Sequence, residues 1–314
     1  MSYKKFDEAD LAFLKSLCGD ERVTERGAVG EDYCHDELGG AFGRPDARVR
    51  VLSTAEISAV MKHASARRIP VTVRGSGTGL VGGAVPVRGG ILLDTSGMTR
   101  ILELDEANMT LTVEPGVLLT DLAKYAEERG FLYPPDPGEK TATIGGNIST
   151  NAGGMRAVKY GVTRDYVRAL EVVLADGTVA TLGGKVAKNS SGYDLKDLVV
   201  GSEGTLAVVT RATLRLVALP KCRISLLVPF PDLPSAIRAV PSIIRAASSR
   251  SKSCPGVVFI EVSSPMYQAS TVLSTRPVAM NHKSFSRPAP LPSVHCIAPC
   301  FAEAANSSGE KRSP

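Results

Sequence analysis

The stretch Val71–Pro86 (VTVRGSGTGLVGGAVP) contains the residues that most clearly indicate a binding site. An extended apolar run enters a loop that contains Gly75, Gly77, Gly79, Gly82 and Gly83. Glycine tolerates positive φ and lets the backbone approach a ligand closely. Successive backbone N–H groups in such a loop can point together at an anion. The stretch therefore predicts a phosphate site made largely of main chain.

Two common nucleotide motifs fit this loop poorly. Gly77–Gly82 (GTGLVG) matches G-x-G-x-x-G, and Asp94 lies near the distance expected of a ribose-binding acid. That fingerprint requires a helix directly after the loop, but further glycines and Pro86 lead instead to a second apolar run, Ile91–Leu93. A Walker A loop would end in Lys-Ser/Thr, which is absent here. Both nucleotide folds are disfavoured.

Further glycine-containing motifs follow in order along the chain. They are Glu114-Pro115-Gly116, Pro134–Glu139 (PPDPGE), Ala142–Asn147 (ATIGGN), Asn151–Gly154 (NAGG) and Gly201–Val209 (GSEGTLAVV). Any one of them is compatible with an ordinary turn. As an ordered set they resemble the FAD-binding domain of the vanillyl-alcohol oxidase and PCMH-type flavoproteins, and most closely its glycolate oxidase and D-lactate dehydrogenase branch. The resemblance covers residues 45–220 and continues more weakly to about residue 247.

The resemblance implies an FAD site and assigns residues to it. FAD carries a pyrophosphate that needs amide donors and a ring system that needs closely fitting walls. Assigned to the pyrophosphate are Arg74, Gly75, Ser76, Gly77, Thr78, Gly79 and Leu80. Assigned to the ribityl chain and rings are Pro135, Asp136, Gly138, Thr143, Ile144, Gly145 and Gly146, with Asn151, Gly153 and Gly154 on the same wall. Glu203, Gly204 and Val208 are assigned to the adenine and ribose side.

Two of the candidate residues have alternative roles. Arg74 either pairs with phosphate or with a surface acid, and phosphate is favoured. Tyr160 either stacks or hydrogen-bonds near the flavin, or it is a core tyrosine. One covalent subgroup of the family carries a histidine where this chain has Thr78, so the FAD is expected to be noncovalent. Neither His35 nor His63 has a set of partners that would support a catalytic or metal role, and no catalytic residue is assigned.

The resemblance also implies an activity, namely oxidation of a D-2-hydroxy acid such as glycolate or D-lactate, with hydride passing from the α-carbon to flavin N5. An electron-transfer flavoprotein, an iron–sulfur subunit or a quinone would then accept the electrons. Two alternatives stay open. The chain is a flavin-binding fragment or subunit without turnover of its own, or it is a different alcohol oxidoreductase on the same domain.

The elements expected to hold these motifs form an α+β fold. A helix capped by Thr54 places Ile57, Val60, Met61 and Ala64 on one face and ends at Arg67-Arg68. Ile69-Pro70 then forces an extended entry into a strand at residues 71–73. Partly alternating strands at residues 111–116 and 206–216, a turn at Asp176-Gly177 and a helix over residues 119–129 closed by Gly130 follow. The resemblance implies two lobes, a small α/β lobe and a larger, mainly antiparallel lobe.

The domain organisation follows from these patterns. We expect an N-terminal helical region at residues 1–44, the FAD-binding PCMH-type domain at 45–221, a partial substrate or cap domain at 222–262 and a low-order tail rich in Ser and Pro at 263–314. Residues 224–247 begin a strand and a helix, which Pro241 interrupts. The histidine-rich HxGDGNxH motif of the family's cap is absent. We therefore expect a truncation or frameshift near Ser248.

Composition and charge argue against several other kinds of protein, including nucleic-acid-binding, membrane and secreted proteins. The 314 residues carry a net charge of +5, spread along the chain, so nucleic acid is not an expected partner. The N-terminus has no apolar run typical of a signal peptide or a membrane span, so a cytoplasmic protein with reduced cysteines is expected. His295, Cys296 and Cys300 lie close together, but they lack the rest of a zinc site, and no metal is expected.

Overall fold

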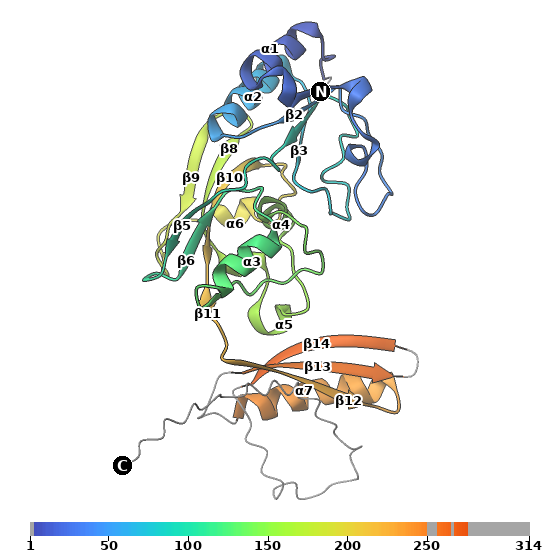
Figure 1. The fold of residues 1–314 in the computed structure, drawn as a ribbon, viewed down its shortest axis with the longest axis vertical. Helices are drawn as coiled ribbons and strands as arrows, with labels where there is room; N and C mark the ends of the chain where they lie inside the picture. The colour runs from blue at the N-terminus through green and yellow to red at the C-terminus, as the bar shows by residue number, and fades with distance from the viewer. Residues whose placement is uncertain (1–2, 250–255, 265–266, 276–314) are drawn as a thin grey trace, which may run out of the picture. The chain divides into compact units, whose positions relative to one another are not determined.

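The structure is a computed structural model that describes residues 3–249, 256–264 and 267–275. The chain divides into two compact units, Met1–Leu219 and Pro220–Pro314. Each is described separately, and the domain boundaries expected at residues 44, 221 and 262 stay predictions. The first unit consists of a small lobe and a larger lobe (Figure 1).

The small lobe is a four-stranded sheet with two helices. The strand order is β1-β2-β4-β3, in which β2, β4 and β3 run parallel and β1 pairs antiparallel with β2. The elements are α1 (Glu8–Cys18), β1 (Val23–Glu25), β2 (Ala47–Arg50), α2 (Thr54–Arg67), β3 (Val71–Arg74) and β4 (Ile91–Asp94). Short 3-10 helices η1 (Asp20–Arg22), η2 (Arg26–Ala28) and η3 (Glu31–Tyr33) connect them. The N-terminal region is thus not purely helical, because β1 completes the sheet.

Helix α2 connects two parallel strands and covers the sheet. Its apolar face is buried at Ile57, Val60 and Ala64, as the i, i+3, i+7 spacing predicts. The N-cap is Ser53, whose hydroxyl accepts a hydrogen bond from the Glu56 N–H at 3.2 Å. The expectation that Thr54 caps the helix is therefore wrong by one residue.

The larger lobe is a five-stranded antiparallel sheet with helices on one side (Figure 1). Its strand order is β5-β6-β10-β8-β9, and its strands are β5 (Ile101–Asp105), β6 (Thr110–Val113), β8 (Val167–Leu174), β9 (Val179–Gly183) and β10 (Ala207–Arg215). A short antiparallel pair joins β7 (Phe131–Leu132) to β11 (Val217–Ala218). The helices are α3 (Leu119–Glu127), α4 (Ile144–Thr150), α5 (Ala157–Tyr160), η4 (Thr163–Tyr166) and α6 (Lys196–Val199). The two-lobed fold expected from the sequence is confirmed.

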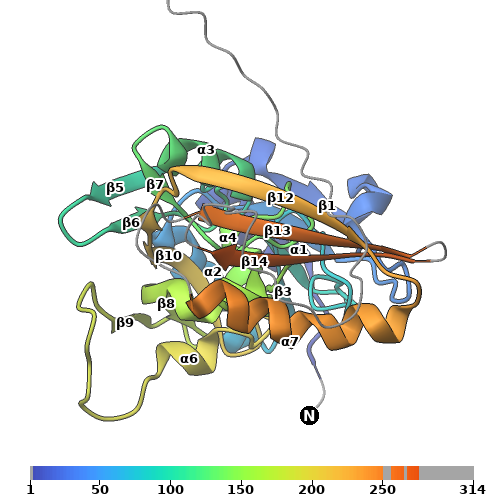
Figure 2. The ribbon, with the colours of Figure 1, turned by 90° about the horizontal axis from the view of Figure 1, so that it is seen from below.

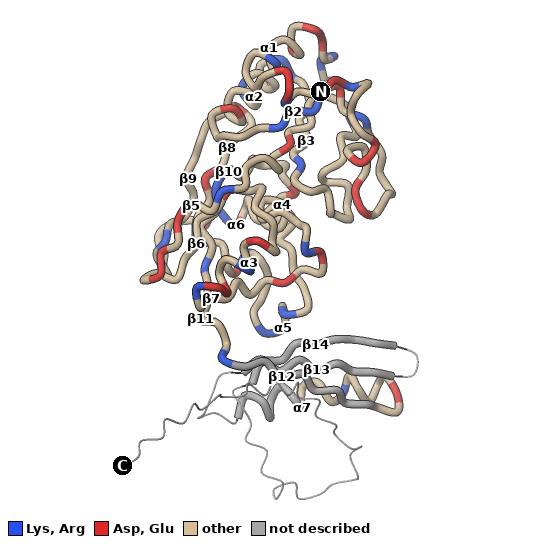
Figure 3. The backbone as a smooth tube through the Cα atoms, in the orientation of Figure 1, with Lys and Arg blue, Asp and Glu red and all other residues tan. Residues whose placement is uncertain are grey.

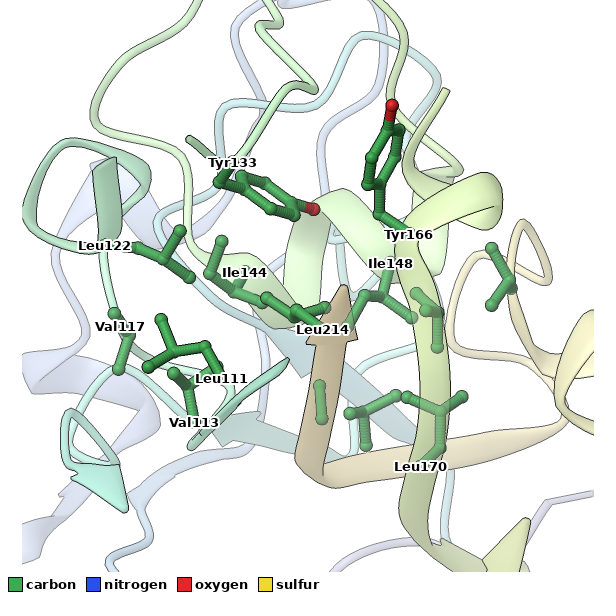
Figure 4. Close-up of a cluster of buried hydrophobic side chains, with 14 of the residues drawn as sticks. Leu111, Val113, Val117, Leu122, Tyr133, Ile144, Ile148, Tyr166, Leu170 and Leu214 are labelled. Atoms are coloured by element: carbon green, nitrogen blue, oxygen red, sulfur yellow. The ribbon is translucent and has the colours of Figure 1, made fainter. Parts of the chain in front are cut away.

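A buried apolar cluster holds the larger lobe together. Ile144 and Ile148 of α4 pack with Leu122 of α3 and with Leu111 and Leu214 of the sheet (Figure 4). All five side chains are essentially inaccessible to solvent. Burying a side chain of this size contributes about 1.5–3 kcal/mol relative to leaving it exposed. The cluster therefore fixes α4 firmly against the sheet.

The two lobes share core residues and hydrogen bonds. Val173 of β8 and Val208 of β10 pack into the small lobe's core. The Thr54 hydroxyl donates to Glu171 Oε1 of β8 at 2.8 Å, and the Ser58 hydroxyl donates to the Gly177 carbonyl at 2.5 Å. These contacts fix one lobe against the other, which defines the space between them.

The second unit is a small α/β element of its own. β12 (Cys222–Pro229) runs parallel to β13 (Gly256–Ser264), which pairs antiparallel with β14 (Tyr267–Thr275), and α7 (Leu233–Ser249) lies beside this sheet (Figures 1 and 2). Helix α7 continues through Pro241, so the expected interruption is wrong. Strand β14 also lies in the segment expected to have little order. Residues 276–314, with the His295–Cys300 cluster, lie outside the described residues.

The charged side chains of the first unit are interspersed rather than gathered by sign (Figure 3). Ion pairs join many of them, such as Arg26 with Asp46 and Lys15 with Glu25, each at 2.7 Å. Within the residues that the structure describes, no helix is both long and apolar enough to cross a membrane.

Candidate functional site

A cavity of about 540 Å³ opens in the first unit and takes its walls from both lobes. This volume is within the range of small-molecule and cofactor sites. Residues expected at the cofactor that line it are Gly75, Ser76, Gly77, Thr78, Gly79, Leu80, Gly138, Thr143, Gly145, Gly146, Asn151, Gly153, Glu203 and Gly204. The structure therefore brings together glycine motifs that are far apart in the sequence.

The glycine loop that follows β3 lines this cavity and contains backbone donors without a partner among the described residues. In the described part of the chain, nothing accepts a hydrogen bond from the backbone N–H groups of Ser76, Gly77, Thr78 or Gly79. Gly77 has a φ of +77°, a conformation that favours glycine. No helix follows the loop before β4, as the sequence predicts. Such a run of unpaired amides is suited to a phosphate group.

Two loops meet at the floor of the cavity through a close contact. The Thr143 N–H donates to the Ser76 hydroxyl at 3.2 Å, and the Thr143 hydroxyl in turn caps α4. A Cβ on Gly75 would clash with that same Thr143 hydroxyl. Gly75 is therefore required by the protein's own packing, because it allows the glycine loop to lie against the start of α4.

Other glycines line the cavity without any packing reason. No described atom lies within 4 Å of the position that a Cβ would take at Gly79 or at Gly138. At Gly145, in contrast, a Cβ would lie 2.6 Å from the Cβ of Pro115. The open space at Gly79 and Gly138 is therefore available to a ligand.

Helix α4 separates the core from the cavity. Ile144 and Ile148 point into the apolar cluster (Figure 4). Residues on other sides of the helix, Gly145, Gly146 and Asn147, line the cavity. Burial of the two isoleucines thus holds this wall of the cavity in place.

Asn147 is a cavity residue that the sequence analysis did not select. Its side chain is 4% exposed, and its Nδ2 has no hydrogen-bond partner among the described residues. A buried amide donor without a partner carries a desolvation cost of about 1–3 kcal/mol. A polar ligand atom in the cavity would remove that cost. Its position at the end of the ATIGGN motif, one residue before the buried Ile148 on helix α4, could have indicated Asn147 from the sequence.

Glu203 adds a carboxylate to the cavity lining. It adopts a φ of +55°, and its N–H donates to the Ser149 carbonyl at 2.8 Å. Its carboxylate makes no ion pair or hydrogen bond with the described residues, and burial raises its pKa. Glu203 and Glu139 are the charged residues in the described lining, which includes no lysine, arginine or histidine.

Seven residues expected at the cofactor do not line the cavity: Arg74, Pro135, Asp136, Ile144, Gly154, Tyr160 and Val208. Ile144 and Val208 are core residues. Asp136 pairs with Lys140 and Arg156, and a Cβ at Gly154 would clash with the Asp136 carbonyl. Tyr160 is partly buried and packs against the apolar cluster.

Arg74 lies instead beside a smaller cavity of about 220 Å³ behind the glycine loop. Burial lowers its pKa, and nearby Asp32 opposes that shift. Its guanidinium donates to backbone carbonyls, not to a surface acid. Asp94, the acid of the rejected dinucleotide motif, is bound by Arg48 at 2.5 Å and by the Ser96 N–H at 2.9 Å.

Few candidate metal ligands or nucleophiles lie near the cavity in the part of the chain that the structure describes. The described residues contain no group of three or more His, Cys, Asp or Glu side chains that could hold a metal ion. Cys18 and Cys34 are free and buried away from the cavity lining. Thr78 lines the cavity where a covalent subgroup would carry histidine.

Taken together, the observed donor set fits a ligand that has both a phosphate and a flat ring. The unpaired amides of the glycine loop suit the phosphate. The open positions at Gly79 and Gly138 and the unpartnered Asn147 amide suit a polar ring system that fills the space between the lobes.

Comparison with known proteins finds one matching family model and several relatives. Residues 45–183 match the family model described as FAD binding domain. The chain is 50% identical over 240 residues to a D-lactate dehydrogenase of Anaerostipes hadrus, covering 76% of this chain and 48% of that protein. It is 45% identical over 234 residues to the glycolate oxidase subunit GlcD of Bacillus subtilis (strain 168), covering 74% and 50%.

A solved structure of alkyldihydroxyacetonephosphate synthase superimposes with a TM-score of 0.65 at 23% identity, covering 79% of this chain and 47% of that one. This likeness shows the fold. The chain spans about half the length of the relatives it matches.

Proposed function

We propose that this chain, whose residues 45–183 belong to the FAD binding domain family, is the flavin-binding part of an FAD-dependent oxidoreductase that acts on D-2-hydroxy acids such as glycolate or D-lactate. The observation that carries the proposal is the cavity between the lobes, with its unpaired loop amides and the unpartnered Asn147 donor. The names of the relatives support the substrate class.

The chain's residues have distinct roles in this proposal. The amides of residues 76–79 bind the pyrophosphate, and Asn147 donates to a polar atom of the ligand. Gly138 leaves room for the ring system, and Gly145 lets the start of α4 lie close against Pro115. When bound, FAD supplies the acceptor for a hydride from the substrate's α-carbon. The absence of histidine and cysteine from the described lining supports a noncovalent FAD.

Substrate binding needs a cation for the carboxylate and a base for the hydroxyl proton. The described lining of the cavity offers neither an arginine, a lysine nor a histidine. This observation favours a second candidate, a flavin-binding fragment or subunit that does not turn over hydroxy acids on its own. A different alcohol oxidoreductase on the same domain is the third candidate.

Anaerobic reduction of the FAD-loaded chain separates these candidates. The protein is mixed with D-lactate, glycolate, L-lactate, an aryl alcohol and a sugar, and the bleaching of the flavin absorption is followed. The proposal predicts reduction by D-lactate or glycolate ahead of the other compounds, at a low rate because the carboxylate lacks a cation. Bleaching by none of them would support the fragment, and bleaching only by the aryl alcohol or the sugar would contradict the proposal.

The remaining partners and the location belong to the same proposal. An electron-transfer flavoprotein or an iron–sulfur subunit would accept the electrons, which agrees with the word subunit in the name of the Bacillus relative. A cytoplasmic location is supported by the free, buried Cys18 and Cys34, which are typical of a reducing compartment.

A further inference from the structure

The Arg74 guanidinium ties the N-terminal segment to both ends of the glycine loop. Its Nη2 donates to the Asp32 carbonyl at 2.6 Å, and its Nη1 donates to the carbonyls of His35 at 2.9 Å and Ala84 at 3.3 Å. The side chain is 6% exposed. Arg74 itself ends β3, and Ala84 lies just beyond the last glycine of the loop. One buried cation thus holds the entrance and the exit of the loop against the same segment.

Asp36 binds the end of the loop and Glu37 binds its middle. Asp36 is 3% exposed, and its Oδ2 accepts a hydrogen bond from the Gly82 N–H at 2.7 Å. The Glu37 N–H donates to the Gly79 carbonyl at 3.2 Å. Together with the Arg74 contacts, residues 32–37 contact the loop region at several points, and we call residues 32–37 the N-terminal brace.

These contacts leave the ligand-facing amides free. The brace binds the loop through the Gly79 carbonyl and the Gly82 N–H, whereas the N–H groups of residues 76–79 stay unpaired among the described residues. Gly77 lies directly against the Arg74 guanidinium, where a Cβ would clash with it. The brace therefore holds the loop in one conformation while the N–H groups of residues 76–79 stay free to bind a ligand. Preorganisation of this kind strengthens binding because less conformational entropy is lost when the ligand binds.

We propose that Arg74 and Asp36 are positioning residues for the pyrophosphate site, which they shape through the glycine loop, and that the site therefore depends on the N-terminal brace outside the family's matched residues 45–183. This inference rests on the proposed binding of FAD. It replaces the expectation that Arg74 pairs with the phosphate.

Charge and positioning predict opposite signs for the variant Asp36→Asn. Asp36 is an anion near the loop that would hold a diphosphate, so the loss of its charge alone would strengthen FAD binding. Asparagine keeps only one acceptor oxygen for the two N–H groups, Gly82 and Gly39, that the Asp36 carboxylate binds, and it lacks the charge that strengthens these bonds. Their weakening would instead loosen the loop and weaken FAD binding. A hydrogen bond to a charged group is strong enough for the second effect to dominate, and we expect FAD affinity to fall roughly tenfold.

The experiment measures FAD affinity by fluorescence titration and backbone hydrogen exchange in the absence of FAD. Asp36→Asn should bind FAD more weakly and exchange faster at residues 75–84, with unchanged exchange in β8 and β10. Arg74→Lys keeps the charge but cannot reach the same carbonyls, and it should show the same local loss. Asp32→Asn is the control, because it removes a carboxylate beside Arg74 and keeps the carbonyl that Arg74 binds.

The outcomes separate this inference from the proposed function. A wild-type chain that does not bind FAD contradicts the proposed function. A wild-type chain that binds FAD, with Asp36→Asn binding equally or more tightly and exchanging at the wild-type rate, overturns the inference alone. Faster exchange at residues 75–84 in the apo protein supports it, because a residue that only contacts phosphate would leave the apo loop unchanged.

Discussion

At the scale of the residue, the glycines of the cavity have two different physical roles. Gly75 and Gly145 are small because other protein atoms occupy the space that a Cβ would take. Gly79 and Gly138 face open space within the same lining. The first pair supports the fold, and the second pair leaves room for the ligand.

This difference makes Gly79→Ala and Gly145→Ala a matched pair. Gly145→Ala should lower the free energy of unfolding by about 1–3 kcal/mol, because the new methyl group is forced against Pro115. Gly79→Ala should leave that free energy unchanged or slightly higher, since it restricts the unfolded chain, but should reduce FAD affinity by about tenfold or more. Denaturant unfolding without FAD and flavin titration measure the two effects. A Gly79→Ala chain that loses stability while it keeps its FAD affinity would contradict this division.

Much of the site at this scale could be predicted from the sequence, and the reason is local. The high glycine content of a loop that follows an extended run predicts backbone amides that are free to bind an anion. Gly77 and Thr78 of this loop do line the cavity. The role of Arg74 could not be predicted, because its carbonyl partners at Asp32 and His35 are distant in sequence. Asn147 was missed because only the folded helix shows that its amide is buried without a partner among the described residues.

At the scale of the element, helices α1 and α2 are joined by a buried carboxylate. Asp10 is inaccessible to solvent, and it accepts hydrogen bonds from Arg67 Nε at 2.9 Å and from the Asp7 N–H at 3.0 Å, with His63 Nε2 at 2.8 Å. Burial alone would raise the pKa of Asp10, but these hydrogen bonds outweigh it and lower the pKa to about 2. The His63 ring also stacks on the Phe13 ring.

The lowered pKa has a defined effect on acid stability. The folded pKa lies below the ordinary value of 3.8, so the stabilisation is fully present above that value and is lost as the pH falls towards about 2. Asp10→Asn should reduce the free energy of unfolding at pH 7 by about 2 kcal/mol and flatten this acid limb. Denaturant unfolding between acidic and neutral pH measures both. Glu8→Gln, an exposed carboxylate on the same helix turn, is the control, and an equal effect of both variants would exclude a special role for Asp10.

The elements themselves were predicted with uneven success. The apolar periodicity of helix α2 and the apolar run of strand β4 predicted both elements. The N-cap of α2 was misplaced because serine and threonine, at residues 53 and 54, are both common N-cap residues. Thr54 instead bonds Glu171 in the other lobe, a long-range contact that no local pattern carries. Strand β14 was missed because apolar and polar residues alternate only weakly along it. Its hydrogen-bonded pairing with β13, which the local sequence does not show, defines it as a strand.

At the scale of the whole molecule, the two lobes of the first unit act as one frame for the cavity. Shared core residues from β8 and β10 and the Thr54–Glu171 bond fix the distance between their walls. The resemblance stated from the motifs already implied this two-lobed arrangement, and the matching family model and the solved fold agree with it. The sequence could not show that the N-terminal brace completes the loop, because that contact exists only after both segments fold together.

The most direct test of the central claim is titration of the flavin-free chain with FAD, with the visible absorption and the thermal unfolding temperature followed together. A ligand that binds only the folded state must stabilise it. We expect saturable, equimolar binding with a perturbed flavin spectrum and a higher unfolding temperature. An unchanged spectrum and an unchanged unfolding temperature at excess FAD, in a chain shown to be folded, would contradict the account.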